Sequence, residues 1–202
     1  LKKSVISNKL FRNLFYLADG TGLALILAHR KSDDFYFFSK EQFSTEKLLE
    51  IIIKSFGEDK VILSEIKDDT LIVFLNNIQV AFFQYNYPLL KPLLKKDSLN
   101  IASIEDISAM KVIAIIQRGT KKDFIDLWTI MKEKKYSLKD IFIFCKTKYR
   151  KAFSKSIALK ALTYFKDAEE EETIKGLKSD FPWENIKKYL IENCRKYFKQ
   201  NL

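Results

Sequence analysis

A glycine-containing turn near the start of the chain is the first candidate for binding chemistry. The stretch reads "FYLADGTGLAL", and its turn contains Gly20, Thr21 and Gly22. The turn opens a predicted helix, and the free N–H groups and positive dipole end at a helix N-terminus attract phosphate. Glycine is also common in ordinary strand-to-helix turns, so the turn alone does not separate a phosphate site from simple chain reversal.

An acidic segment follows this helix and reads "SDDFYFF". On a strand, residues two apart share a face, and two carboxylates at that spacing can hold a pair of divalent cations. Here Asp34 shares its face with Tyr36, and Asp33 shares its face with Phe35. A phenol is a poor ligand for a hard cation. The local pattern therefore predicts one metal-binding carboxylate and not a pair.

Two further cationic residues, Arg30 and Lys111, have two interpretations each. Arg30, just after the predicted helix, either clamps a phosphate or completes the helix C-terminal dipole. His29 is the only histidine, and we expect it in a cap or a buried hydrogen bond. Lys111 lies on an otherwise apolar helix and needs an anion there. That anion is either a nucleotide phosphate or a structural partner, Asp123 or Asp126, which share one face of the next helix.

The elements that must position these residues follow from the hydrophobic pattern. We predict helices over 4–14, 20–28 and 44–57 and strands over 15–18 and 35–38. Three strands within 60–85 are separated by "KDD" and "NN" and form an antiparallel meander, and a proline-containing connection follows. From residue 103 onward the pattern predicts five helices. The chain is therefore predicted to be α+β, with a mixed or antiparallel sheet and flanking helices in 1–100 and a helical bundle in 101–202.

Bulk properties limit the class of protein. The chain has 202 residues, is 47% hydrophobic and has a net charge of +10. It contains no apolar run long enough to cross a membrane and no secretory signal pattern at its start, so we expect a cytoplasmic protein. The positive charge favours acidic partners such as nucleotides or RNA, or else reflects a lysine-rich proteome. The basic run 146–156, with Tyr149 and Phe153 interleaved, either grips RNA or forms a helix corner with buried rings.

Several of these stretches together resemble the AbiEii/AbiGii toxin-type nucleotidyltransferases of the polymerase-β-like superfamily. The resemblance rests on "LADGTGLAL", "HRKSDDFYFF" and "IASIEDISAMKVIAIIQRGTKKDFIDLW", in that order, with further similarity at "FFQYNYPLL" and "ALTYFKDAEEEE". It implies a nucleotidyltransferase-like fold and transfer of a nucleoside monophosphate from an NTP, with Mg²⁺, to an RNA such as tRNA or to a protein. It also implies a bacterial toxin–antitoxin or phage-defence role with a cognate antitoxin as partner.

The resemblance assigns roles by position. Residues implied to bind the nucleotide are Gly20, Thr21, Arg30, Ser32 and Lys111. Residues implied to be catalytic are Asp34, Lys111, Asp123 and Asp126, and Asp34 is the implied metal ligand.

Three positions depart from the family pattern. Asp19 stands where the family has the first glycine of a pair, Tyr36 where it has the second metal aspartate, and Ala81 where the superfamily often has a third carboxylate. Two hypotheses therefore remain: a Mg²⁺-dependent nucleotidyltransferase with a reduced metal site, or a catalytically degenerate relative that binds nucleotide, RNA or a protein partner.

Overall fold

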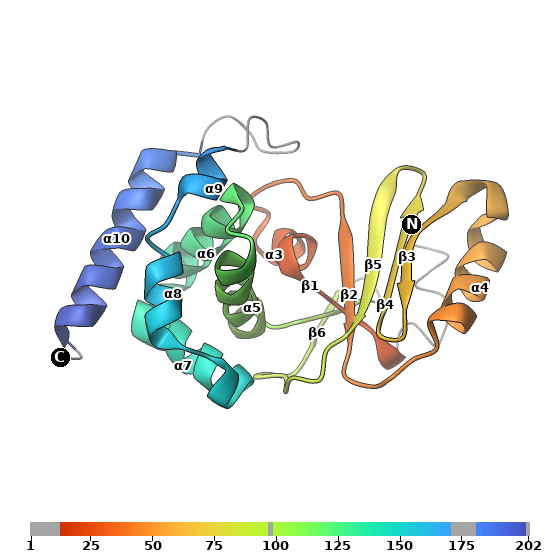
Figure 1. The fold of residues 1–202 in the computed structure, drawn as a ribbon, viewed down its shortest axis with the longest axis horizontal. Coiled ribbons are helices and arrows are strands. Elements are labelled where there is room, and N and C mark those ends of the chain that lie inside the picture. Colours follow the sequence, from red (N-terminus) through yellow and green to blue (C-terminus); the bar gives the residue numbers. More distant parts are fainter. Residues whose placement is uncertain (1–12, 97–98, 171–180, 201–202) are drawn as a thin grey trace. The chain divides into compact units, whose positions relative to one another are not determined.

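The chain forms two compact units, and helix α3 (Asp19–Leu27) passes from one to the other (Figure 1). The computed structural model describes residues 13–96, 99–170 and 181–200. One unit comprises Leu1–Gly22 and Ser32–Ser103, and the other comprises Leu23–Lys31 and Ile104–Leu202. Most of the helix predicted over 4–14 lies outside the described residues.

The first unit is built on a seven-stranded mixed sheet with strand order β3-β4-β5-β2-β1-β7-β6. The pairs β1–β7 and β2–β5 are parallel, and the other four neighbouring pairs are antiparallel. The strands are β1 (Tyr16–Ala18), β2 (Phe35–Ser39), β3 (Val61–Lys67), β4 (Thr70–Leu75), β5 (Ile78–Gln84), β6 (Leu94–Lys96) and β7 (Leu99–Ile101).

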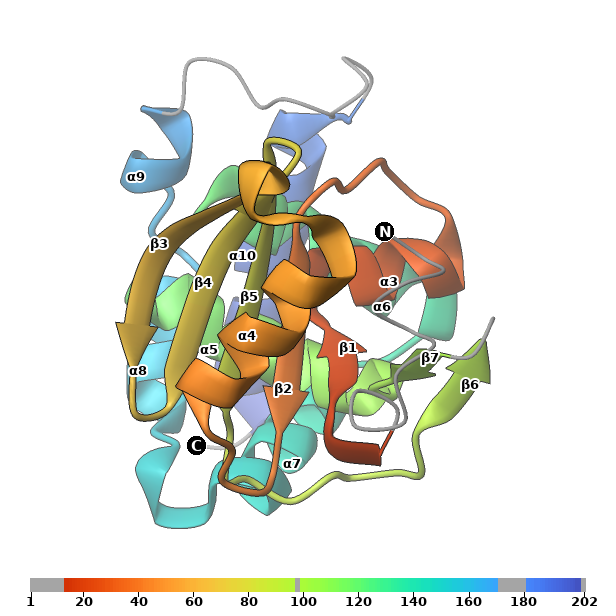
Figure 2. The same cartoon turned by 90° about the vertical axis from the view of Figure 1, so that its right-hand side faces the viewer.

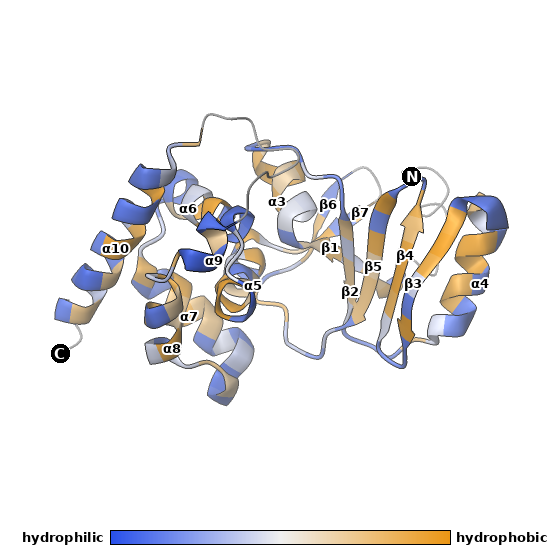
Figure 3. Ribbon diagram, turned by 45° about the horizontal axis from the view of Figure 1, so that its top comes forward, coloured by the Kyte–Doolittle hydropathy of each residue, from blue (hydrophilic) through white to orange (hydrophobic). Residues whose placement is uncertain are grey.

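The predicted meander is present and its turn chemistry explains it. Asn76 and Asn77, between β4 and β5, both have positive φ, 50° and 63°. A two-residue turn with positive φ at both positions matches the twist of a hairpin, and asparagine tolerates that conformation. β4 alternates buried and half-buried residues, and the hydrophobic colour along it is visible in Figure 3.

Helix α4 (Thr45–Phe56) packs on β3 and β4, and Figure 2 shows it crossing the sheet. Ser44 caps it by accepting a hydrogen bond from the backbone N–H of Lys47, and Leu48 and Ile52 are buried on its inner face. Gly57 ends it at φ 91°, a conformation that favours glycine. The predicted boundaries at both ends of this helix are confirmed.

The segment between β5 and α5 differs from the prediction. Its two prolines indicate an extended connection, but the structure contains two short strands, β6 and β7. β7 pairs in parallel with β1 through Leu17 and Ile101, and the Ala102 N–H donates to the Leu17 carbonyl. Strands of three residues leave too little local pattern to predict them, and β7 in addition pairs with β1, more than eighty positions away.

The second unit is helical and is organised around α5. Its helices, besides the end of α3, are α5 (Ile104–Gln117), α6 (Lys121–Lys134), α7 (Leu138–Tyr149), the 3-10 turn η2 (Arg150–Ala152), α8 (Lys155–Ala161), α9 (Lys166–Glu169) and α10 (Trp183–Gln200). α5 contacts α6, α7 and α8, which explains why it is apolar on almost every side. The α+β class and the helical C-terminal part are confirmed. The short α9 was not predicted.

One buried ion pair lies inside this helical unit. Lys148 Nζ of α7 is 2.7 Å from Asp106 Oδ1 of α5, and both side chains are fully buried. Burial of charge is tolerated only when the charge is paired, so this contact fixes the registry of α7 on α5. No helix in the described part of the chain is long and apolar enough to cross a membrane.

Backbone strain marks both ends of α3. Asp19, its first residue, has φ 58°, and Ala28, the residue after its last, has φ 53°. This left-handed conformation costs a residue with a Cβ about 1–2 kcal/mol relative to glycine. The resemblance places a glycine at position 19. Asp19 therefore adopts the left-handed backbone conformation that is typical of a glycine at this position.

We expect Asp19→Gly and Ala28→Gly each to increase the free energy of unfolding by about 1 kcal/mol, because relief of the strained φ exceeds the extra entropy of glycine in the unfolded chain. Asp19→Ala should be less stable than Asp19→Gly by a similar amount. Urea denaturation of the three variants beside wild type measures this. Equal stability of Asp19→Gly and Asp19→Ala would contradict it.

Candidate functional site

The glycine turn and the acidic segment meet within the first unit. Thr21 Oγ1, in the first turn of α3, lies 2.8 Å from Ser32 Oγ, and the Thr21 hydroxyl also donates to the main-chain carbonyl of Asp34. Thr21 is buried, and Asp34 is half-buried. Three of the residues singled out from the sequence are therefore in direct contact, although Ser32 and Asp34 lie more than ten positions from Thr21.

Close packing explains the second glycine of the turn. A Cβ at position 22 would lie 3.3 Å from the Leu17 carbonyl oxygen and 3.5 Å from Cγ2 of Ile101. Gly22 therefore allows the start of α3 to approach the backbone of β1. This fixes the α3 N-terminus, with Gly20 and Thr21 in its first turn, against the central strands of the sheet.

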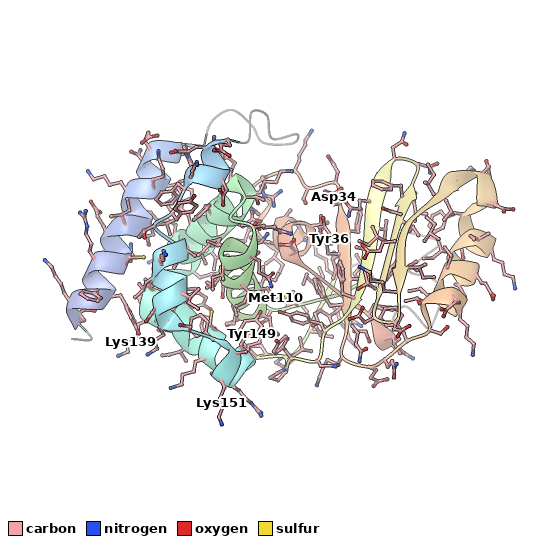
Figure 4. The ribbon with its side chains drawn as sticks, in the orientation of Figure 1. Asp34, Tyr36, Met110, Lys139, Tyr149 and Lys151 are labelled. Atoms are coloured by element: carbon pink, nitrogen blue, oxygen red, sulfur yellow. The ribbon has the colours of Figure 1, made fainter. Side chains whose placement is uncertain are left out.

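The sheet residues beside Asp34 carry no carboxylate. Tyr36 of β2 pairs with Ala18 of β1 on one side and with Ala81 of β5 on the other. The Tyr36 ring stacks on Phe83 with 6.2 Å between ring centroids. Figure 4 shows Asp34 and Tyr36 at the same end of β2. The row that a two-metal site would occupy is thus alanine, tyrosine, alanine.

Within the part of the chain that the structure describes, these donors fit one divalent cation that also takes ligands from substrate phosphates, and they do not fit a pair of cations. Among the described residues there is no group of three or more His, Cys, Asp or Glu side chains that could hold a metal ion. Mg²⁺ is often held by one or two carboxylates together with substrate phosphates and waters. Asp34 is compatible with that single-carboxylate arrangement, and a two-metal arrangement lacks its second carboxylate.

The second unit contains a buried charge cluster centred on Asp126 of α6. Asp126 accepts from Arg30 in a two-pronged contact, with Nε at 2.7 Å and Nη2 at 2.8 Å. His29 Nε2 lies 2.7 Å from the same carboxylate, and Lys111 Nζ of α5 lies 2.9 Å from it. The Asp126 side chain is fully buried, and those of Arg30 and Lys111 are 3% and 2% exposed.

Asp123, one turn earlier on α6, extends this cluster toward solvent. It accepts from Lys111 at 2.9 Å, from Thr120 at 2.7 Å and from both Nε and Nη2 of Arg118 at 2.9 and 3.0 Å. Asp123 is buried, whereas the Arg118 side chain is 48% exposed. Arg118 is therefore the cation of the cluster that is most open to an anion from outside.

Both carboxylates are held ionised. Burial by itself would raise the pKa of Asp123, but Lys111, Arg118 and Thr120 outweigh it and lower that pKa to about 2. Burial likewise opposes ionisation of Asp126, and Lys111, Arg30 and His29 lower its pKa well below the usual range. Permanently charged aspartates of this kind are suited to holding cations in place and not to exchanging protons near neutral pH.

The geometry separates the sequence-predicted residues into two groups. Gly20, Thr21, Ser32 and Asp34 lie together in the first unit, and Arg30, Lys111, Asp123 and Asp126 lie together in the second. Of the two interpretations of Lys111, the structural pairing is present, with both aspartates, and His29 makes the expected buried hydrogen bond.

Sequence reasoning missed two features of the second group. Arg118 was not predicted to bind Asp123, and Arg30 was not matched with Asp126, which lies 96 positions away. The available signal for Arg118 was its position five residues before Asp123, across the turn that joins α5 to α6. His29 Nδ1 is buried and has no hydrogen-bond partner among the described residues.

Asp126→Asn should destabilise the chain by about 3–5 kcal/mol, because it leaves the buried Arg30 and Lys111 cations without the charge that compensates them. Asp34→Asn, at a half-buried position outside this cluster, is the matched control and should change the stability by less than about 1 kcal/mol. Urea denaturation measures both. If Asp126→Asn unfolded at the same urea concentration as wild type, the cluster would contribute nothing to the stability.

Acid unfolding should depend on Asp123. Its folded pKa of about 2 lies below the ordinary value of 3.8, so its contribution to stability is complete above pH of about 4 and is lost as the pH falls toward 2. In Asp123→Asn the stability should vary less over that interval. Thermal unfolding followed at pH steps between 2 and 6 measures this, and parallel curves for the two proteins would contradict it.

Comparison with known proteins supplies the family. A family model described as "Nucleotidyl transferase AbiEii toxin, Type IV TA system" matches residues 3–188. The uncharacterized protein aq_aa25 of Aquifex aeolicus (strain VF5) is 40% identical over 196 residues, covering 93% of this chain and 89% of that protein.

Solved structures are similar in fold. A candidate nucleotidyltransferase from Helicobacter pylori aligns with a TM-score of 0.63 at 15% identity, over 98% of this chain and 92% of that one. JHP933, also from Helicobacter pylori, aligns with a TM-score of 0.60 at 14% identity, over 98% and 89%. ANT(2″)-Ia in complex with adenylyl-2″-tobramycin aligns with a TM-score of 0.51 at 12% identity, over 70% and 91%. The fold is that of the nucleotidyltransferases, and the chain belongs to the AbiEii nucleotidyl transferase toxin family.

Proposed function

We propose that this chain transfers a nucleoside monophosphate from an NTP to an acceptor, an RNA such as tRNA or alternatively a protein, as the toxin of a bacterial toxin–antitoxin or phage-defence pair. The contact of Thr21 with Ser32 and with the Asp34 backbone carries the proposal. It joins a helix N-terminus suited to phosphate and a carboxylate at one place, which is the combination that nucleotidyl transfer requires. The family match supports the same conclusion.

The residues of the first unit take the binding roles. Backbone N–H groups at Gly20 and Thr21, at the start of α3, would hold phosphate oxygens, and the helix dipole favours negative charge there. The Thr21 and Ser32 hydroxyls hold the turn and the acidic segment together. Asp19 places a negative charge beside these phosphates, and its removal should therefore strengthen NTP binding.

The transfer itself is a substitution at phosphorus. A hydroxyl oxygen of the acceptor forms a bond to the α-phosphorus of the NTP, the bond from that phosphorus to the bridging oxygen breaks, and pyrophosphate leaves with its electron pair. The hydroxyl proton passes to solvent. Asp34 would hold Mg²⁺ accompanying the triphosphate, whose charge that ion would neutralise. The buried Asp126 holds Arg30 and Lys111, and the buried Asp123 holds Lys111 and Arg118. These two carboxylates are positioned to hold cations and not to touch the reacting atoms.

The alternative is a degenerate relative that binds nucleotide, RNA or a protein partner without transfer. The row of Ala18, Tyr36 and Ala81 favours it, because loss of a metal carboxylate commonly removes several kcal/mol of transition-state stabilisation. A cognate antitoxin as partner and a cytoplasmic location belong to the proposal in either case, as expected for a toxin of this family.

Titration calorimetry with each NTP, with and without Mg²⁺, tests the proposal. We expect Mg²⁺-dependent binding that weakens at least tenfold in Asp34→Ala, because the carboxylate that directly precedes β2, beside the turn, is lost. Asp33→Ala is the matched control, since it removes the neighbouring exposed carboxylate, and it should bind like wild type. Absence of binding with every NTP would contradict the proposal.

Transfer of label from a radiolabelled NTP to total tRNA then separates the two functions. We expect transfer by wild type and faster transfer by Tyr36→Asp, which restores a second carboxylate on the face of Asp34. NTP binding without transfer in either protein would establish the degenerate alternative.

A further inference from the structure

The net positive charge of the chain is confined to one of its two units. The first unit contains twelve Lys or Arg and twelve Asp or Glu residues, so its formal charge is zero. The second contains 24 basic and 14 acidic residues and carries the whole net charge of +10. A lysine-rich proteome would raise the charge of both units alike. It therefore does not explain why the second unit carries the whole net charge and the first unit carries none.

Within the second unit the charge concentrates between the end of α6 and the end of α8. Residues 132–160 contain ten Lys or Arg and two acidic residues. Lys148 is buried against Asp106, and the other nine cations are exposed. Of the two acids, Asp140 is occupied in the capping box with Ser137 at the start of α7. The exposed charge of this segment is therefore almost purely positive.

Helix α7 presents these cations along one face. Lys139, Ile143 and Lys146 are spaced by four and three residues, which places them on one side of α7, and all three are exposed. Lys139 and Lys146 span about 10 Å of helix axis at 1.5 Å per residue, and the exposed Arg150 and Lys151 follow directly after the helix. A nucleic-acid duplex strand has one phosphate per about 3.4 Å, so this row passes several phosphates.

The corresponding outer face of α4 in the first unit is different. Its exposed charged residues are Glu46, Lys47, Glu50 and Lys54, which balance in sign. The outer face of α4 is therefore not basic, in contrast to the face of α7. Figure 4 shows Lys151, just after α7, pointing away from the helices.

The aromatic rings of the basic run do not take part in this surface. Tyr149 is 5% exposed, and Phe153 packs edge-on against Phe142 with 5.5 Å between ring centroids. The interpretation of 146–156 as a helix corner with buried rings therefore holds for the rings, while its cations remain outside. Such a surface contacts phosphates and does not stack bases, so its binding should be independent of sequence and strongly salt-dependent.

We propose that the outer face of α7 with η2, formed by Lys139, Lys146, Arg150 and Lys151, binds the phosphate backbone of a structured RNA. The choice of RNA rests on the proposed function, in which an RNA is the acceptor. The surface supplies affinity and orientation, and the chemistry remains with the Thr21, Ser32 and Asp34 group.

The test is fluorescence anisotropy with a labelled RNA hairpin of 20 base pairs, from 50 to 200 mM salt. The variant Lys139→Gln, Lys146→Gln and Lys151→Gln lowers the net charge by three. Lys151 is used in place of Arg150 because Arg150 has a φ of 51° and a substitution there could alter the backbone. The matched control, Lys40→Gln, Lys47→Gln and Lys54→Gln, lowers the net charge equally at exposed positions of the first unit.

We expect the α7 variant to bind at least tenfold more weakly, with a salt slope reduced by about two to three, and the control to bind within threefold of wild type. Circular dichroism establishes that both are folded. If the triple variant does not fold, Lys146→Gln alone should lower the slope by about one. The proposal would be overturned by equal loss in both triple variants, by no loss in the α7 variant, or by no binding of the RNA hairpin by wild type.

Calorimetry with NTP and the transfer assay separate this inference from the proposed function. If RNA binding depends on α7 but no nucleotide is transferred, the RNA-binding surface is supported and the proposed transferase activity is refuted. If the α7 variant transfers nucleotide to RNA as fast as wild type, the transferase activity is supported and the RNA-binding surface is refuted.

Discussion

The Asp126 carboxylate is the contact on which the helical unit depends. It binds Arg30 and His29, which lie almost a hundred positions earlier, together with Lys111 of α5. These contacts attach the segment 23–31 to α5 and α6, although the chain on both sides of that segment belongs to the other unit. A buried charge set of this kind is costly to break, because each cation left alone would be uncompensated in the interior.

The same cluster changes how the family positions are understood. Lys111 and Arg30 resemble nucleotide-binding residues in sequence, yet the structure uses both to neutralise buried aspartates. Arg118, held by both oxygens of Asp123, is about half exposed and is the member that reaches solvent. A role for Asp123 and Asp126 in positioning these cations agrees with their lowered pKa values.

The first unit has the opposite character, with a strained and sparsely charged site. Asp19 keeps the left-handed backbone that glycine would adopt freely, and Tyr36 lies between two alanines where a metal site would have acids. Backbone strain that persists in a folded protein is compensated by the surrounding structure. Here the close approach of Gly22 to Leu17 and the Thr21–Ser32 contact provide that compensation. The start of α3 is thus held against the sheet, while Tyr36 and the alanines paired with it provide no second carboxylate beside Asp34.

The sequence by itself determined whatever depends on neighbours along the chain. The capped helix α4, the hairpin at Asn76–Asn77 and the shared helix face of Asp123 and Asp126 all follow from short-range spacing and turn chemistry. Only the tertiary structure decided that Arg30 binds Asp126, that β7 pairs with β1, that Lys148 is buried against Asp106, and that Tyr149 is covered while Lys146 and Lys151 are exposed. These features join residues tens of positions apart, and burial of a charge or a ring depends on what packs over it. Periodicity along one segment carries no information about that packing.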